Sequence, residues 1–311
     1  MQEFKTYLQN KNLSSVTIKE YKRQKNLFKN WHNGEAINCQ KKDILEYLSY
    51  LKNTKKLQSI SRNNALISLR HYFDYLLQQK EIATNPTTLI KLRGLNKRKL
   101  KHIYNLEELN SLADNYYQLE VKKAEENLIL KANRNTTKNS YLAQVRNYNI
   151  LQLFIHQGLN TREVLELQTD DIQLHKAIIQ IPKGSQRGNA RNLPLHATQI
   201  GSLMQYINEI RPQLAKNKES NLLFLPTKQS QKPAKNVATA LKKLSKALKV
   251  IDKQFSNFAQ LRASVITYWI KTYGLRKAQY LAGHKSIVST EEYIPNNIED
   301  LAEDITKFNP F

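Results

Sequence analysis

Apolar residues recur at helical intervals through most of this chain, and no other feature restricts its fold as strongly. After the cap candidates Ser14 and Ser15, one broad helix face carries Ile18, Tyr21, Phe28 and Trp31. Comparable faces follow until the Asn-Pro pair at 85–86, which does not fit inside a helix. We therefore expect residues 1–93 to form a small helical bundle.

The period changes between residues 171 and 196, where short apolar segments alternate with turn residues. The segments Ile172–Leu174, Ala177–Ile181 and Asn192–Leu195 are typical of strands joined by turns. Helical spacing resumes at about 197–214 and 234–249. The sequence thus predicts a mainly α fold with a small antiparallel β-sheet inside an α+β second domain.

The charge balance indicates a polyanionic partner. The chain has 311 residues, with 49 Lys and Arg against 26 Asp and Glu, so its formal charge is +23. Such a balance favours nucleic acid or a membrane surface. No apolar stretch approaches the ~18–20 residues of a spanning helix, and the first residues, MQEFKTYL, lack a signal-peptide layout. We expect a cytoplasmic protein that binds nucleic acid and has no membrane partner.

Two residue types exclude other classes of site. A single cysteine, Cys39, argues against disulfides and a cysteine-based zinc site. The eight glycines form neither GxGxxG nor GxxxxGK[ST], which argues against a dinucleotide fold or a phosphate-binding P-loop. We therefore expect no cofactor and no metal.

Charge also divides the chain. Residues 94–103 predict a basic linker, and Asn105 with Glu108 forms a capping-box pattern that opens a helix after it. We expect a second domain over 104–294 and an acidic tail over 295–311. By itself, the basic run is typical of a solvated connector. Its cations are Lys97, Arg98, Lys99 and Lys101.

Two segments contain the candidate chemical residues of the chain. The first, QGLNTREVLELQTDDI at 157–172, contains Glu163 and precedes a hairpin with Lys183. The second, at 258–294, contains Arg262 in an LR dipeptide and His284 in AGH. Tyr293 follows nine residues after that histidine.

In this order and spacing, the chain resembles the tyrosine recombinase (phage integrase) family over essentially its whole length, in the Xer-like two-domain form. That family combines a helical core-binding domain, a basic linker, a GLR-x-x-E box, a hairpin Lys, HxLR, LGH and a terminal Tyr. Four of the six active-site positions match, and Glu163 matches the supporting acid of the first box. The four are Lys183, Arg262, His284 and Tyr293.

Two positions depart from the family pattern. Asn160 stands where the first box has its arginine, and Ala259 stands where HxLR has its histidine. The histidine that often follows LR is also replaced, by Ala263. Removing one group that stabilises transition-state charge typically costs about 10²–10³ in rate. We therefore expect an activity that is slow or absent unless another residue substitutes.

Three arginines are candidates for that substitution. Asn160 and Glu163 form a capping-box pattern, so Asn160 is expected to cap a helix. Arg162, two residues on, lies about 200° around that helix and should face away from the site. Arg191 and Arg187, on the hairpin that carries Lys183, are better placed and rank first.

The resemblance implies that the Tyr293 hydroxyl attacks a DNA phosphodiester and leaves a 3′-phosphotyrosine link and a free 5′-hydroxyl. The bond energy is kept in that link, so no metal or nucleotide is required. Arginine suits the phosphate because its rigid fork grips two oxygens and stays charged, whereas lysine can protonate the leaving oxygen. The resemblance assigns these tasks to Arg262 and Lys183, with His284 beside them.

The resemblance also implies that the protein binds double-stranded DNA, acts as a homo-tetramer on two duplexes and is encoded by a mobile element. Accessory DNA-bending proteins are candidate partners. The tail 295–311 would pack into a neighbouring protomer or fold back on its own domain. One helix start carries small polar and basic groups suited to DNA contacts, and an ordinary capped helix is the alternative. These residues are Ser59, Ser61, Arg62, Asn63 and Asn64.

Two other functions remain open at this point. Asn160 and Ala259 favour a catalytically impaired DNA-binding protein, an accessory factor or repressor that kept the recombinase scaffold. The shared chemistry also allows a nicking-closing activity like that of type IB topoisomerases. Formation of a covalent DNA adduct separates the repressor from both enzymes.

Overall fold

The computed structural model describes residues 3–93, 102–130, 134–183, 188–215, 219–227 and 233–294. The chain divides into two compact units, 1–99 and 100–311. Several predicted features lie outside the described residues: the linker cations Lys97, Arg98, Lys99 and Lys101, the hairpin residue Arg187, and the tail 295–311. Each unit is described separately below.

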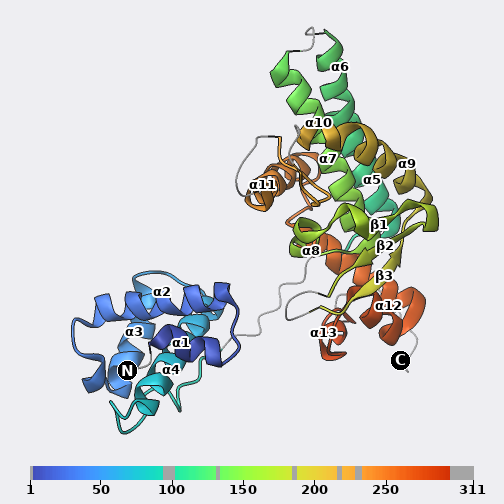
Figure 1. The fold of residues 1–311 in the computed structure, drawn as a ribbon. Helices are drawn as coiled ribbons and strands as arrows, with labels where there is room; N and C mark the ends of the chain where they lie inside the picture. The colour runs from blue at the N-terminus through green and yellow to red at the C-terminus, as the bar shows by residue number, and fades with distance from the viewer. Residues whose placement is uncertain are drawn as a thin grey trace, which may run out of the picture. The chain divides into compact units, whose positions relative to one another are not determined.

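The first unit is a helical bundle, coloured blue to cyan in Figure 1. Its helices are α1 (Phe4–Asn10), α2 (Ser15–His32), α3 (Lys41–Asn53) and α4 (Ser59–Gln78). Ser14 caps α2 by accepting a hydrogen bond from the Thr17 amide at 3.2 Å, as its position predicts. Aromatic rings fill the core, where Phe28 contacts Tyr47 and Phe73 edge to face.

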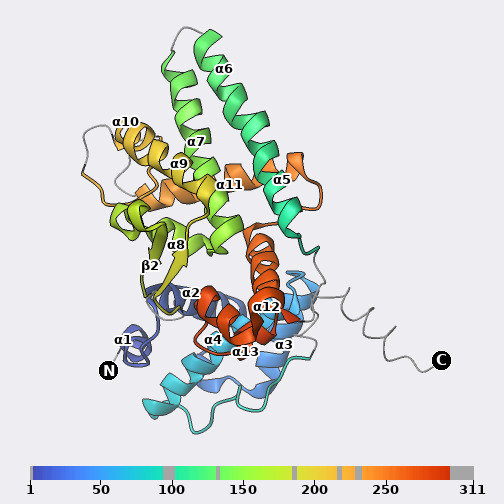
Figure 2. The same ribbon diagram turned by 90° about the vertical axis from the view of Figure 1, so that its right-hand side faces the viewer.

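The second unit is also mainly helical. Two long antiparallel arms extend from it (Figure 2). One comprises α5 (Leu106–Tyr116), a π-helical stretch over Tyr117–Lys122 and α6 (Lys123–Leu130), and the other is α7 (Asn135–Gln157). The remaining helices are α8 (Thr161–Glu166), α9 (Ala197–Gln205), α10 (Arg211–Ala215), α11 (Pro233–Ile251), α12 (Phe258–Ala282) and α13 (Val288–Glu291).

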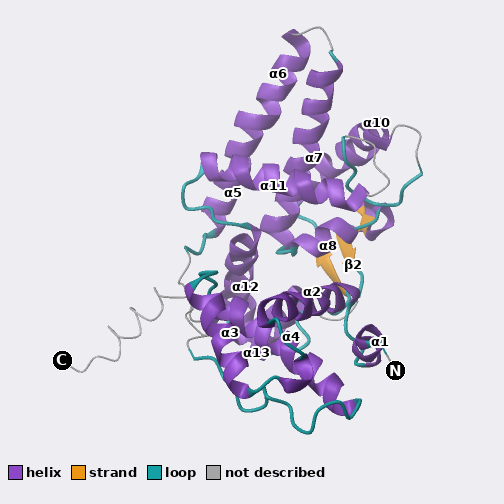
Figure 3. Cartoon of the chain, turned by 90° about the vertical axis from the view of Figure 1, so that its left-hand side faces the viewer, coloured by secondary structure: helices purple, strands orange, loops and turns teal. Residues whose placement is uncertain are grey.

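A three-stranded antiparallel sheet lies among these helices in the order β1 (Ile172–Gln173), β2 (Ile178–Ile181), β3 (Arg191–Pro194). The mainly α fold with a small antiparallel sheet is therefore confirmed (Figure 3). The predicted bounds of the last strand are wrong by one residue at each end. It begins at Arg191, which pairs with Ile181, and ends before Leu195. The buried side chain at the start of β3 is thus a charged one.

In the core of the second unit, buried side chains of α7 and α12 pack against each other. Both helices end close to the site described next. α7 contributes buried Phe154, whose ring stacks on Phe258 at 4.4 Å. α12 is interrupted at Gly274, where φ is 78° and ψ is 166°. Among the described residues, no helix has both the length and the apolar character needed to cross a membrane.

Candidate active site

The first part of the site is the amino-terminal turn of α8. The Asn160 side-chain oxygen accepts hydrogen bonds from the amides of Arg162 and Glu163, both at 2.9 Å. Glu163 Oε2 in turn accepts from the Asn160 amide at 2.9 Å. The predicted capping box is therefore present, and it fixes the Glu163 carboxylate at this turn.

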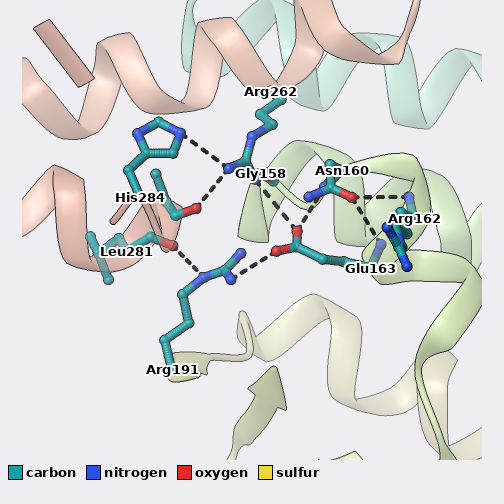
Figure 4. A network of polar contacts seen from close by, with 9 residues as sticks. Gly158, Asn160, Arg162, Glu163, Arg191, Arg262, Leu281 and His284 are labelled. Atoms are coloured by element: carbon teal, nitrogen blue, oxygen red, sulfur yellow. Dashed lines mark hydrogen bonds and ion pairs between the residues drawn. The ribbon is translucent and has the colours of Figure 1, made fainter. Parts of the chain in front are cut away.

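Glu163 joins two arginines from distant parts of the chain (Figure 4). Its Oε1 accepts a hydrogen bond from Arg191 Nη1 at 2.9 Å, and its Oε2 lies 3.5 Å from Arg262 Nη1. Burial raises the pKa of the Glu163 carboxyl, but the hydrogen bond and charge of Arg191 and the charge of Arg262 outweigh it, so the pKa is lowered. Glu163 is an anion at neutral pH.

Arg262 lies in the first turns of α12, and backbone carbonyls hold its guanidinium. Nη1 donates to the Gly158 carbonyl at 2.5 Å, and Nη2 donates to the Ala282 carbonyl at 2.6 Å. Gly158 ends α7 with a φ of 55°, and a Cβ there would lie 3.0 Å from Val265. The close approach of α7 to α12 therefore places one of the carbonyls that orient Arg262.

His284 follows the left-handed Gly283 that ends α12. Its Nδ1 lies 2.9 Å from Thr290 Oγ1, and its Nε2 lies 3.4 Å from Arg262 Nη2. Burial, with the charges of Arg262 and Arg191, lowers the pKa of His284 to about 4. The ring is neutral at pH 7. Because a guanidinium only donates, Nε2 is assigned as the acceptor and Nδ1 as the protonated nitrogen.

Tyr293 stacks on His284, with ring centroids 5.8 Å apart and ring planes 14° apart. Its phenol also favours the charged form of the Arg262 guanidinium. Burial nevertheless dominates and lowers the pKa of Arg262. The structure therefore brings Tyr293, His284, Arg262 and Glu163 into one cluster.

The hairpin that follows β2 docks on the end of α12. Gly188 forms an antiparallel bridge with His284, and the Asn189 amide donates to the Gly283 carbonyl at 3.0 Å. This docking delivers Arg191 to the cluster, where its Nε donates to the Leu281 carbonyl at 2.7 Å. Lys183, at the other side of the hairpin, is exposed.

Other candidates lie away from this cluster. Arg162 is exposed and forms an ion pair with Glu166 at 2.8 Å, so it faces away as expected. Ala259 is exposed and Ala263 is buried. The predicted DNA-contact residues Ser59, Ser61, Arg62, Asn63 and Asn64 open α4 in the other unit, where Arg62 Nη2 donates to Ser59 Oγ at 3.1 Å.

Sequence reasoning missed two residues that shape the site. Thr290 is fully buried and orients His284 through Nδ1. Gly283 has a φ of 70°, and a Cβ there would lie 2.5 Å from Arg191 Nη1. Its place directly before His284 was the available signal, since glycine is the usual residue at a left-handed helix end.

Comparison with known protein families finds two matching regions of the chain. Residues 120–299 match the phage integrase family, and residues 1–80 match the phage integrase N-terminal SAM-like domain. The chain belongs to the phage integrase family. The resemblance inferred from the motifs is thereby confirmed.

Known relatives of this phage integrase family member extend over its full length. This chain is 25% identical to the tyrosine recombinase XerD of Staphylococcus epidermidis, over 100% of this chain and 98% of the relative. The structure of the XerH site-specific recombinase bound to palindromic difH substrate has a TM-score of 0.68 at 20% identity, covering 95% of this chain and 80% of that one. A lambda integrase tetramer bound to a Holliday junction has a TM-score of 0.61 at 14% identity, covering 93% and 74%.

A second polar cluster lies in the first unit of this integrase family member. The ligand-type atoms of His32, Cys39 and Asp43 lie within 4.8 Å of one another. Burial, with the charge of Asp43, raises the pKa of the Cys39 thiol to about 12, and Asp43 Oδ2 accepts from the Gln40 amide at 2.7 Å. These properties describe a packed junction between α2 and α3, with a protonated thiol.

Proposed function

We propose that this member of the phage integrase family is a site-specific recombinase that cuts and rejoins DNA through a 3′-phosphotyrosine intermediate. Tyr293 is the nucleophile, and Arg262 is the guanidinium that binds the scissile phosphate. The observation that supports this most directly is the stacking of Tyr293 on His284, whose Nε2 lies 3.4 Å from Arg262 Nη2. The cluster thus combines a phenol with a guanidinium, a cation suited to phosphate.

The reaction exchanges one phosphodiester for another. The Tyr293 oxygen forms a bond to phosphorus, the bond from phosphorus to the 5′-oxygen breaks, and DNA keeps its 3′-phosphate on the tyrosine. The phenol loses a proton and the 5′-oxygen gains one, so no external oxidant or energy source is needed. Rejoining is the same exchange in reverse.

The surrounding groups divide this work. Neutral His284, stacked on Tyr293, accepts the phenol proton at Nε2, directly or through water, when Arg262 turns from that nitrogen to the phosphate. Exposed Lys183 supplies a proton to the leaving 5′-oxygen when the hairpin meets DNA. Glu163 holds the phosphate-binding guanidinium in place through its 3.5 Å ion pair with Arg262.

The same proposal assigns the larger parts of the chain. Residues 1–93 bind duplex DNA through the start of α4, the linker 94–103 follows the DNA backbone, and 104–294 carry the chemistry. The net charge of +23 supports binding that weakens steeply with salt. The protein is encoded by a mobile element and acts in the cytoplasm. It assembles as a homo-tetramer in which the tail 295–311 packs into a neighbouring protomer, and accessory DNA-bending proteins assist it. The tetramer in the lambda integrase structure supports the assembly.

Trapping of the covalent intermediate tests the proposal. The probe is a pool of nicked duplexes with randomised sequence, in which cleavage releases a short oligonucleotide that diffuses away and prevents rejoining. We expect a denaturant-resistant adduct with the unaltered protein and none with Tyr293→Phe. Tyr280→Phe, at an exposed tyrosine of α12, is the matched control and should retain the adduct.

The two alternatives give different results in the same assay. DNA binding without an adduct would contradict the enzyme and support a repressor or accessory factor. An adduct accompanied by relaxation of supercoiled DNA at no preferred sequence would instead support a topoisomerase-like activity. Asn160 is the specific observation behind the first alternative, because no arginine stands at that position.

A further inference from the structure

Arg191 is a buried cation with an unused donor. Its side chain is 1% exposed; Nε donates to the Leu281 carbonyl at 2.7 Å and Nη1 to Glu163 at 2.9 Å. Nη2 is buried and has no hydrogen-bond partner among the residues that the structure describes. A buried donor left unpaired costs about 1–3 kcal/mol, and more on a charged group. This atom therefore indicates a position where an acceptor binds.

That position belongs to the proposed active site. Arg191 packs so closely on Gly283 that a Cβ there would lie 3.0 Å from its Cζ, and Gly283 is the residue before His284. Arg191 and Arg262 approach Glu163 from opposite sides, with both guanidiniums directed to the centre of the cluster (Figure 4). The charges of both arginines also lower the pKa of His284.

The charges of the cluster do not balance. Arg191 and Arg262 contribute two positive charges, Glu163 contributes one negative charge, and His284 is neutral at pH 7. One buried positive charge remains uncompensated among these four groups. Such a charge is costly unless an anion accompanies it, and a phosphodiester carries one negative charge. The cluster thus has the charge and the free donor of a phosphate site.

We propose, resting on the recombinase function above, that Arg191 replaces the arginine missing at Asn160 and that its Nη2 binds the scissile phosphate beside Arg262. Asn160 is not available for this task, because its side-chain oxygen caps α8. Arg162 is exposed and pairs with Glu166. The two phosphate-binding guanidiniums then come from β3 and α12, and the first box contributes only the carboxylate that holds them.

The rate of adduct formation tests this role. With the nicked-duplex pool, we expect Arg191→Ala to slow adduct formation by about 10²–10³, the usual cost of removing one transition-state donor. Arg191→Lys keeps the charge and the fold but loses the rigid fork, and it should also be slow. Arg146→Lys is the control, since Arg146 is another buried arginine of this unit and binds the Leu225 carbonyl and Asn147 instead.

Arg191 could instead support the site only by orienting Glu163. That role and direct phosphate binding predict different effects of substrate charge on the rate of adduct formation. A methylphosphonate at the phosphate mapped from the trapped pool removes one anionic oxygen, so the transition state needs less positive charge. We expect this substrate to reduce the deficit of Arg191→Ala relative to the unaltered protein at least tenfold. A deficit of the same size on both substrates would overturn phosphate binding by Arg191.

The outcomes separate the two proposals. A normal rate in Arg191→Ala, with a Tyr293-dependent adduct in the unaltered protein, overturns the role of Arg191 and leaves the recombinase function intact. No adduct in the unaltered protein overturns the recombinase function and the role of Arg191 with it. If Arg191→Ala fails to fold, Arg191→Lys answers the same question on both substrates.

Discussion

At the scale of single residues, Gly283 has the most exacting position in the site. Its φ of 70° is unfavourable for any residue with a side chain, and its missing Cβ leaves room for Arg191. A left-handed conformation costs about 1–2 kcal/mol for an L-residue, and displacement of Arg191 adds to that cost.

We therefore expect Gly283→Ala to lower the free energy of unfolding by more than about 1 kcal/mol and to slow adduct formation. Urea denaturation and the nicked-duplex assay measure the two effects. The control is Gly201→Ala in α9, where a Cβ would meet nothing within 4 Å. That change should stabilise the helix by about 0.5–1 kcal/mol. Equal behaviour of the two variants would contradict the close approach at Gly283.

Two histidines make stability depend on pH. Burial is the main reason that the pKa of His284 is lowered to about 4; the same is true of His156, which also stacks on His196. In the unfolded chain both have a pKa near about 6.5. The unfolded state therefore binds protons that the folded state excludes, and the free energy of unfolding should fall as the pH drops from about 6.5 to about 4.

Urea denaturation across this pH range checks that expectation. The double variant His156→Asn/His284→Asn should show a flatter profile than the unaltered protein, since the carboxylates that also titrate there are common to both. Profiles of equal slope would show that neither histidine is held neutral by the fold.

Sequence patterns predicted which residues form the site, but they did not predict all of the contacts between those residues. Glu163, Arg262, His284 and Tyr293 were predicted from motif spacing, and the structure places them in one cluster. The partners of Arg191 were not predicted, because an ion pair across 28 residues leaves no local signal. Whether these residues carry the roles given to them stays a prediction until the adduct assay is done.

At the scale of elements, apolar spacing predicted the helices and strands, but it did not always predict the residues at which they begin and end. The change of period located all three strands, but β3 begins one residue early, at a buried arginine. Periodicity assigns charged residues to the surface, so it could not place Arg191 inside. The Glu163 carboxylate and the Leu281 carbonyl, which both accept hydrogen bonds from Arg191, favour that burial.

α12 contains a break that sets the direction of its second half. Gly274 has a φ of 78° and a ψ of 166°, a combination almost restricted to glycine. The segment after it supplies the Leu281 and Ala282 carbonyls that hold Arg191 and Arg262. The break therefore determines where those two acceptors lie.

Gly274→Ala is expected to cost about 1–3 kcal/mol of stability, because alanine is strained in that conformation. Adduct formation should slow as well, since the two carbonyls move. Thr272→Ala, at an exposed position two residues earlier, should change stability by less than about 0.5 kcal/mol. Urea denaturation and the adduct assay measure the free energy of unfolding and the rate for both variants. If neither quantity changes in Gly274→Ala, the break in α12 is dispensable.

At the scale of the whole molecule, each of the two compact units has its own core. Phe28 is fully buried in the first and Phe154 in the second. Units with separate cores can unfold in separate transitions.

Calorimetry should therefore resolve two unfolding transitions. Phe28→Ala should lower only one of them and Phe154→Ala only the other, each by the equivalent of about 3–5 kcal/mol for a large cavity. A single transition that both substitutions shift equally would mean that the units unfold as one.

The charged cluster has a consequence for how the protein is made. Its members are contributed by residues 160–163, 191, 262 and 281–293, so they leave the ribosome one after another and His284 and Tyr293 emerge after the rest. A nascent chain that has emerged only as far as the sheet has Glu163 and Arg191 but neither the second guanidinium nor the phenol. A nascent chain that lacks residues 281–293 therefore lacks the phenol on which the proposed reaction depends, and we expect it to form no DNA adduct.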